Sequence, residues 1–223
     1  DYASSAGNGF VGVGWGLAVG ETITRVSATH GAPRGDASDG FTLHGNDLIP
    51  CAAGSPSPSC TTAIAAFGSS AGFYSTRIES FERIRRDTGA VDGWTIWGRD
   101  GTQRTFRSPD QGATYQLTAV TDPYGNTVSY DTWCDAQDAC YPDAIRYAAV
   151  GAAPGASIRF HREPRPDPFT VGRAGSFTGS IQTMYRLASI VVSMDGKLAR
   201  AYRLRYAQSL GSRASVLASI EQL

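Results

Sequence analysis

One short motif in the chain could carry nucleophilic chemistry. Residues 68–72 read Gly-Ser-Ser-Ala-Gly, which matches the GxSxG nucleophile elbow with Ser70 as its serine, and His161 follows later. Such an elbow requires a strand before the serine and a helix after it, within alternating β and α units. The surrounding sequence reads as hairpins instead, and His161 lies in a strand-like run. We therefore interpret the motif as a Ser/Gly turn, with a serine hydrolase using Ser70 as an alternative hypothesis.

A second motif, GxGxxG at residues 7–12, could in principle bind a phosphate. A dinucleotide site needs a strand before the glycines and a helix after them, so that the phosphate meets a helix N-terminus. Further glycines at 14 and 16 would destabilise such a helix, and the run that follows is strand-like. We predict a sharply bent segment with close backbone packing around Trp15, and we assign Gly12 and Trp15 a structural role.

The cysteines form two close pairs, Cys51 with Cys60 and Cys134 with Cys140. Three connectivities exist for four cysteines, and the sequence does not choose among them, although local pairing is the simplest. Neither pair has CxxC spacing and the three histidines stand at no ligand spacing, so we expect no metal and no cofactor. Even, local cysteines favour disulfides in an oxidising compartment, so we expect a secreted, extracellular protein.

The composition favours a folded β protein. Of 223 residues, 41% are hydrophobic, 18% are charged and 26 are glycine, and the net charge is zero. This hydrophobicity opposes disorder, and the charge balance opposes nucleic-acid binding. No signal peptide or apolar run of membrane-spanning length occurs, so we expect no membrane insertion by this segment. The abrupt beginning and end lead us to expect a piece of a longer protein.

Three turn sequences predict hairpins. Asp100-Gly101 and Asp195-Gly196 separate runs rich in strand-forming residues, and the stretch 123–126 adds Gly125 and Asn126. A two-residue turn at Asp195-Gly196 would place Leu187 opposite Leu204, Ser189 opposite Tyr202, Ile190 opposite Ala201 and Val192 opposite Ala199. Both faces of that hairpin are partly apolar, which predicts a position within a wider, covered sheet.

The remaining segments complete the predicted fold. Further strands are expected at 144–150, 157–161 and 216–220, and long loops at 31–62 and 163–180. Residues 77–86 fit a helix or a strand, and periodicity does not decide between them. The expected fold is mainly β, an antiparallel sheet of successive hairpins over one module, 1–223, either curved into a shell fragment or packed as a β-sandwich.

Several segments, taken in order, resemble one known family, the SpvB-type N-terminal domain, which also begins the B component of Tc insecticidal toxins. The segments that carry the resemblance are Asn8-Gly9-Phe10-Val11-Gly12-Val13-Gly14-Trp15-Gly16-Leu17 with Ile23-Thr24-Arg25, Asp39-Gly40-Phe41-Thr42-Leu43 with Asp47-Leu48-Ile49, Tyr74 to Ile84, Trp94-Thr95-Ile96-Trp97 with Asp100-Gly101, and Arg186-Leu187-Ala188-Ser189-Ile190. Asp122 to Asn126 with Ser129-Tyr130 is similar to the Rhs-type repeat signature.

The resemblance implies a role in containment. In Tc toxins, segments of this type form part of a hollow β shell around a toxic C-terminal polypeptide. The family's ADP-ribosylating domain is separate, and neither Ser75-Thr76-Arg77 nor Glu79-Ser80-Phe81-Glu82 matches its catalytic pattern. We therefore expect a non-catalytic structural module, with the rest of its own polypeptide or other toxin-complex subunits as partners. The other alternative is an extracellular module that binds carbohydrate or protein through its long loops, with Phe169 and Phe177 as candidate contacts.

Overall fold

A computed structural model of the protein describes residues 1–109, 112–148, 155–172 and 180–223. The predicted mainly-β, antiparallel fold is confirmed. The described chain divides into two compact units, which we treat separately. Unit 1 comprises residues 1–19, 128–172 and 180–223, and unit 2 comprises residues 20–127.

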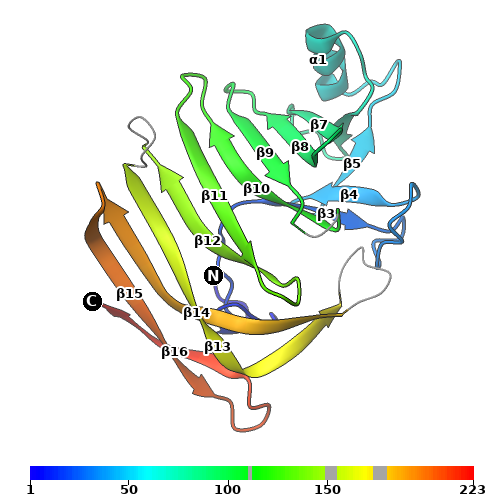
Figure 1. Ribbon diagram of the computed structural model, residues 1–223. Helices are drawn as coiled ribbons and strands as arrows, with labels where there is room; N and C mark the ends of the chain where they lie inside the picture. The colour runs from blue at the N-terminus through cyan, green and yellow to red at the C-terminus, as the bar shows by residue number, and fades with distance from the viewer. Residues whose placement is uncertain (110–111, 149–154, 173–179) are drawn as a thin grey trace. The chain divides into compact units, whose positions relative to one another are not determined.

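Unit 2 is a closed β-barrel with one helix attached (Figure 1). Its elements in the described residues are β3 (Thr22–Val26), β4 (Gly40–Leu43), β5 (Asn46–Pro50), α1 (Pro58–Phe67), β6 (Phe73–Thr76), β7 (Arg83–Thr88), β8 (Asp92–Trp97), β9 (Gln103–Arg107) and β10 (Thr114–Thr121). Each strand pairs antiparallel with its predecessor in the unit, and β10 pairs with both β9 and β3. Because the ladder closes on itself, the barrel has no free sheet edge.

Large side chains fill the barrel. Trp94 on β8 pairs across the sheet with Phe106 on β9, and both are fully buried. The Trp94 ring also meets Phe41 edge to face, with centroids 5.0 Å apart, and contacts Tyr115 at 6.0 Å. Residues paired across an antiparallel sheet share a face, so the buried cross-strand partners form one layer inside the barrel. Trp97 faces the other side, as its spacing from Trp94 requires, and contacts Phe67 of α1 at 5.2 Å.

The predicted loop at 31–62 is wrong in part, because it contains β4, β5 and the beginning of α1. The helix has local signals that explain it. Ser57 is the N-cap and accepts a hydrogen bond from the Cys60 N–H, and Pro58 begins the helix. Gly68 ends it in the left-handed conformation, at φ 72°. None of the helices in the described ranges has the length and apolar character of a membrane span.

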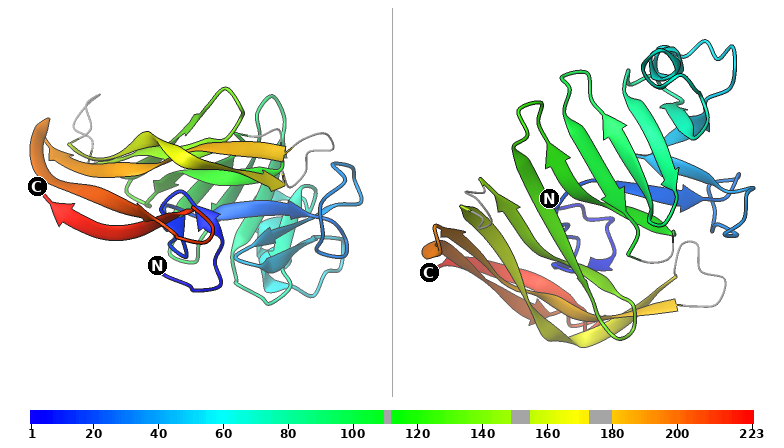
Figure 2. Two further views of the ribbon diagram at one scale, coloured as in Figure 1. Left: turned by 90° about the horizontal axis from the view of Figure 1, so that it is seen from below. Right: turned by 45° about the horizontal axis from the view of Figure 1, so that its top comes forward.

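Unit 1 contains a six-stranded antiparallel sheet and a short N-terminal hairpin (Figure 2). The sheet order is β16-β15-β14-β13-β12-β11 within the described residues. Its strands are β11 (Thr127–Cys134), β12 (Cys140–Tyr147), β13 (Ala156–Gly172), β14 (Ser180–Met194), β15 (Lys197–Gln208) and β16 (Ser215–Gln222), and the hairpin consists of β1 (Asn8–Gly9) and β2 (Gly12–Val13). The strands predicted at 157–161 and 216–220 fall within β13 and β16. Of the strand predicted at 144–150, residues 144–147 form the end of β12, Ala148 follows that end with a positive φ of 53°, and the last two residues lie outside the described ranges.

The N-terminal segment packs on the sheet of unit 1. Val11, between the two hairpin strands, is buried in one cluster with Phe160, Leu187 and Leu204 from three sheet strands. Trp15 packs against this cluster. The Leu187 N–H also donates a 2.8 Å hydrogen bond to the Phe10 carbonyl. Burial of apolar area therefore fixes a segment that has little regular structure of its own.

The predicted loop at 163–180 is wrong up to residue 172, because β13 continues to Gly172, and residues 173–179, with Phe177, lie outside the described ranges. Pro164, Pro166 and Pro168 are exposed, whereas Arg165 between them is buried. The pairing of β13 with β14 is interrupted here: Pro164 pairs with Tyr185, and the next pair is Phe169 with Thr183. Proline lacks the N–H that a sheet ladder needs, so it is tolerated where the strand bulges.

The Asp195-Gly196 hairpin forms, but its predicted register is wrong beyond the turn. Both turn residues have positive φ, 49° and 73°, as a two-residue type I′ turn requires. Met194 pairs with Lys197 and Ser193 with Leu198, as the turn dictates, but Val192 pairs with Arg200 and Ile190 with Tyr202. An extra residue at Ala199 forms a β-bulge that shifts every later pair by one position.

The other two predicted turns are longer than two residues. At Asp100-Gly101, β8 ends at Trp97, and the Gly98 N–H donates to the Thr102 carbonyl. Gly101 alone of the Asp-Gly pair has positive φ, 85°, and the Asp100 carboxylate accepts the Thr102 N–H at 2.9 Å.

At the third turn, Gly125 has φ 88° and the Asp122 carboxylate accepts hydrogen bonds from Asn126. The hydrogen bonds from Asn126 outweigh a small effect of burial and lower the pKa of Asp122.

For residues 77–86, the sequence did not decide between a helix and a strand. The structure has strand only from Arg83, where β7 begins.

Candidate functional site

The glycine-rich N-terminal motif forms a tight hairpin and is followed by no helix in the described part of unit 1. Gly12 has φ 90°, and a Cβ at this position would lie 2.7 Å from the Ser215 carbonyl oxygen. Gly14 has φ 78°, and its Cβ would lie 2.7 Å from the Tyr2 ring. Trp15 contacts that ring, with centroids 5.2 Å apart. The glycines therefore permit close backbone packing, and the geometry offers no helix N-terminus for a phosphate.

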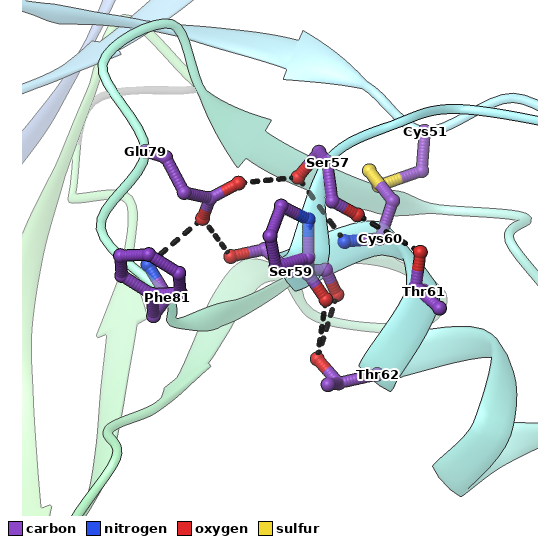
Figure 3. The surroundings of a disulfide bond; sticks show 9 residues. Cys51, Ser57, Ser59, Cys60, Thr61, Thr62, Glu79 and Phe81 are labelled. Carbon is purple, nitrogen blue, oxygen red and sulfur yellow. Dashed lines mark hydrogen bonds between the residues drawn. A yellow bond between two sulfur atoms is a disulfide. The ribbon is translucent and has the colours of Figure 1, made fainter.

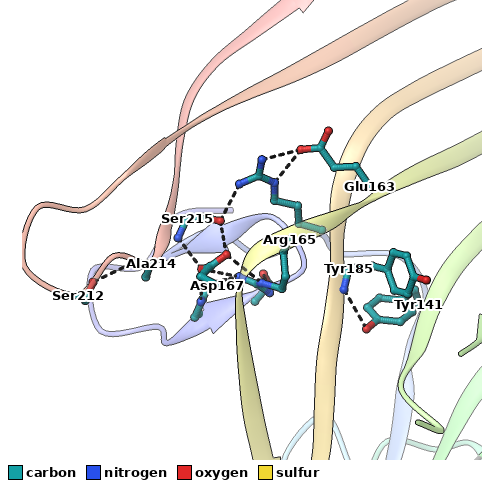
Figure 4. A network of polar contacts seen from close by, with 11 residues as sticks. Tyr141, Glu163, Arg165, Asp167, Tyr185, Ser212, Ala214 and Ser215 are labelled. Carbon is teal, nitrogen blue, oxygen red and sulfur yellow. Dashed lines mark hydrogen bonds and ion pairs between the residues drawn. The ribbon is translucent and has the colours of Figure 1, made fainter. Parts of the chain in front are cut away.

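A buried ion pair joins this hairpin to β13 and β16 (Figure 4). The Arg165 side chain is fully buried and its guanidinium lies 3.1 Å from Asp167. Arg165 also donates to the Asn8 side-chain oxygen at 2.7 Å and to the Gly9 carbonyl at 3.2 Å. Asp167 in turn accepts hydrogen bonds from the Ser215 N–H at 2.6 Å and from Asn8 Nδ2 at 2.9 Å. Three segments far apart in sequence thus meet at one carboxylate.

The electrostatics of Asp167 reflect these bonds. Burial alone would raise its pKa, but the hydrogen bonds from Arg165, Ser215 and Asn8 outweigh burial and hold the pKa far below the ordinary value. Arg186 extends the network, donating to Glu163 at 2.7 Å and to the Ser215 hydroxyl at 2.8 Å. Each carboxylate oxygen of Asp167 already accepts at least two hydrogen bonds, so this cluster is suited to fixing the backbone.

Sequence reasoning missed the Arg165 cluster because residues 163–180 were expected to form a loop. The signal was the alternation Arg165-Pro166-Asp167-Pro168-Phe169. Alternate residues of a strand face opposite sides, so the prolines and the charged residues separate. Phe169 lies on the Arg165 side, and the guanidinium carbon stands 4.4 Å from its ring centroid.

The first disulfide joins Cys51, just after β5, to Cys60 in the first turn of α1 (Figure 3). Glu79 supports the same turn from outside the disulfide-closed loop, accepting hydrogen bonds from the hydroxyls of Ser57 and Ser59. Burial opposes these bonds, but they prevail and lower the pKa of Glu79. The helix is therefore held by a covalent link and by a charged capping group.

The second disulfide, between Cys134 and Cys140, closes the turn between β11 and β12, where the two residues are direct cross-strand partners. Asp135 organises the closed turn, accepting 2.9 Å hydrogen bonds from the N–H groups of Gln137 and Ala139. Both local disulfides are thus present in the structure.

The structure does not support an elbow around Ser70. The apolar run before Ser70 is α1, which ends at Gly68, so a helix precedes the serine where an elbow needs a strand. His161 lies on β13 in unit 1, whereas Ser70 belongs to unit 2. His30 and His44 lie near Asp47 and Glu21, at 3.3 and 3.5 Å. Across the described ranges, no three His, Cys, Asp or Glu residues group as a metal site would require.

Comparison with known proteins places the chain in a family. The family model described as the Salmonella virulence plasmid 65 kDa B protein, SpvB, matches residues 1–147. The solved N-terminal domain of the effector protein SpvB from Salmonella typhimurium strain LT2 is 17% identical, with a TM-score of 0.76 over 100% of this chain and 92% of that one. No curated protein matches this chain.

The same fold occurs within much longer chains. The structure of TcdB2-TccC3-Cdc42 is 20% identical, with a TM-score of 0.75, and the Photorhabdus luminescens Tc holotoxin pore is 21% identical, with a TM-score of 0.73. Each match covers 99% of this chain but spans only 14% of the matched chain's length. The family model covers about two thirds of the sequence and includes the resembling segments up to Tyr130, whereas the segment from Arg186 to Ile190 lies beyond its end. The chain belongs to the SpvB family.

Proposed function

We propose that this chain is a non-catalytic structural module of a secreted toxin or surface protein, and that it forms part of a β shell around a C-terminal effector. One observation carries the proposal. The fold of this chain matches nearly the whole SpvB N-terminal domain, and the same fold makes up 14% of the length of a Tc toxin chain. A fold that serves both as a separate domain and as a portion of a larger toxin chain is suited to assembly. Its partners would be the rest of its own polypeptide or other toxin-complex subunits.

The physical construction supports a structural role. Closing the ladder of unit 2 removes sheet edges that would pair with other chains, and large side chains such as Trp94 and Phe106 fill its interior. We infer that residues 1–223 act as one module, since the likeness to the SpvB domain spans both units. The two disulfides support folding in an oxidising compartment, and hence an extracellular location.

Protease protection tests the proposal. The longest natural polypeptide that contains this chain would be treated with protease, and cleavage of its C-terminal part followed. We expect protection in the native protein and in a Gly7→Ala control, and faster cleavage in Gly12→Ala, which should open unit 1. Rapid cleavage of the C-terminal part in the native protein, with this module still intact, would rule containment out.

A serine hydrolase using Ser70 is the competing catalytic hypothesis. A fluorophosphonate probe labels activated serines, so labelling of the native chain that is lost in Ser70→Ala would establish it. A Ser69→Ala variant is the matched control, because Ser69 belongs to the same turn. Absence of labelling in the native chain would end the hypothesis.

The second non-catalytic candidate is a binding module. A cavity in unit 2 favours this candidate.

A further inference from the structure

The closed ladder of unit 2 has a short opening beside the end of β5, because β4 is shorter than β5. The two strands pair at Leu43–Asn46, Thr42–Asp47 and Phe41–Leu48, and the pairing stops there although β5 continues to Pro50. A cavity of about 470 Å³ lies at this opening, and the loop between β3 and β4 forms its other wall. This volume is in the range of cavities that hold small organic ligands.

Aromatic and cationic side chains meet in the cavity. Phe41 and Tyr74 contribute rings, and Arg86 reaches in from β7 with 22% of its side chain exposed. The Arg86 guanidinium carbon lies 4.7 Å from the Phe41 ring centroid and 5.9 Å from that of Trp94. Stacking on Phe41 and Trp94 holds the planar guanidinium in a fixed orientation.

Arg86 has donors that the described residues do not use. Its Nη2 makes only long contacts, 3.3 Å to the Tyr115 hydroxyl and 3.4 Å to Asp92. Its Nε is buried and has no hydrogen-bond partner among the residues that the structure describes. A guanidinium carries five N–H donors, and a buried donor left without a partner lowers the stability of the fold.

The other charges that line the cavity are used within the protein. Arg25 is ion-paired with Asp39 at 3.0 Å, and Arg77 with Asp47 at 2.8 Å. Asp39 also accepts the N–H groups of Arg34 and Gly35. Asp36, the remaining acidic residue in the lining, accepts hydrogen bonds from Ser38. The acidic groups of the cavity are therefore satisfied. Arg25 Nε, like Arg86 Nε, has no hydrogen-bond partner among the described residues, but it lies in a close ion pair with Asp39, whereas the contacts of Arg86 are all long.

We propose that this cavity binds a small organic anion, with its carboxylate or phosphate on Arg86 and its apolar part against Phe41 and Tyr74. The fork of a guanidinium matches both anionic groups, and a charge-assisted hydrogen bond is about twice as strong as a neutral one. The site does not rest on the proposed shell function, because the observations behind it concern only the side chains in and around the cavity.

Binding can be measured by NMR titration of the isotope-labelled chain with three probes: benzoate, phenyl phosphate and the neutral benzamide. We expect one or both anions to shift the resonances of Arg86, Phe41 and Tyr74, and benzamide to bind at least ~10-fold more weakly. The preferred anion distinguishes a carboxylate ligand from a phosphate ligand. Arg86→Gln should weaken anion binding by ~10-fold or more, while Arg77→Gln, in the same lining, should not.

Several results would overturn the site. The proposal fails if neither anion saturates the chain below about 20 mM, or if benzamide binds as tightly as the anions. It also fails if the resonance shifts are confined to residues outside the cavity, or if Arg86→Gln binds the anions as tightly as the native chain. If Arg86→Gln does not fold, Arg86→Lys takes its place, since lysine keeps the charge but loses the fork. Arg86→Lys should bind several-fold more weakly than the native chain, and equal binding would count against the proposal.

Discussion

Gly12 lies so close to Ser215 that a Cβ at position 12 would stand 2.7 Å from the Ser215 carbonyl oxygen. The N–H and hydroxyl of the same Ser215 donate to Asp167, the carboxylate that pairs with buried Arg165. The N-terminal hairpin, the bulge of β13 and the start of β16 are therefore held at a single point. Backbone contact on one side and a charged network on the other leave little room for adjustment.

Gly12→Ala should destabilise the chain by about 2–4 kcal/mol, because a positive φ and a backbone overlap both oppose the added methyl group. Urea denaturation measures the free energy of unfolding. Gly7→Ala is the control, since a Cβ at Gly7 would meet nothing within 4 Å. Equal stability of the two variants would show that the hairpin can move away from Ser215 at little cost.

Asp167→Asn should cost about 3–5 kcal/mol, because it leaves the fully buried Arg165 charge without a counterion. Glu221→Gln removes a surface ion pair with Arg205, in which about half of each side chain is exposed, and should cost no more than about 1 kcal/mol. Both losses can be read from urea denaturation curves. A small loss for Asp167→Asn would mean that water or a neighbouring group compensates Arg165.

Each disulfide should contribute about 2–3 kcal/mol by restricting the unfolded chain, since the bonded cysteines are 9 and 6 residues apart. The paired variants Cys51→Ala/Cys60→Ala and Cys134→Ala/Cys140→Ala test the two bonds separately, with thermal unfolding as the measurement. A reducing agent should lower the Tm of the native chain but leave unchanged a variant that lacks all four cysteines. An unchanged Tm of the native chain on reduction would contradict the prediction.

Stability should fall at alkaline pH because of Tyr115. Burial, followed by the hydrogen bond to Asp92, raises the pKa of Tyr115 to about 12, whereas the unfolded chain ionises near pH ~10. The unfolded state therefore loses the proton first, and the stabilisation present below pH ~10 is lost as the pH rises toward ~12. Tyr115→Phe cannot ionise, so its stability should fall less over this window in urea denaturation. Parallel profiles for the two proteins would refute this account.

Much of the fold could be predicted from the sequence where the causes are local. The Asp195-Gly196 turn follows from two residues that tolerate positive φ. The order of the family segments along the chain is likewise visible in the amino-acid sequence alone. The helix at Pro58–Phe67 was missed although its Ser57, Pro58 and Gly68 signals were present, since the surrounding Pro, Ser and Ala suggested a loop.

The sequence by itself determined the β class, the turn positions and two cysteine pairs close enough to bridge locally, because these depend on backbone preferences and short chain distances. Only the tertiary structure decided the register beyond Ala199, since a bulge depends on how a strand fits its partner. It also decided that β10 closes the barrel by pairing with β3, and that Asn8, Asp167 and Ser215 meet. Contacts between residues so far apart in the chain are selected by burial and shape across the whole core, which no local pattern encodes.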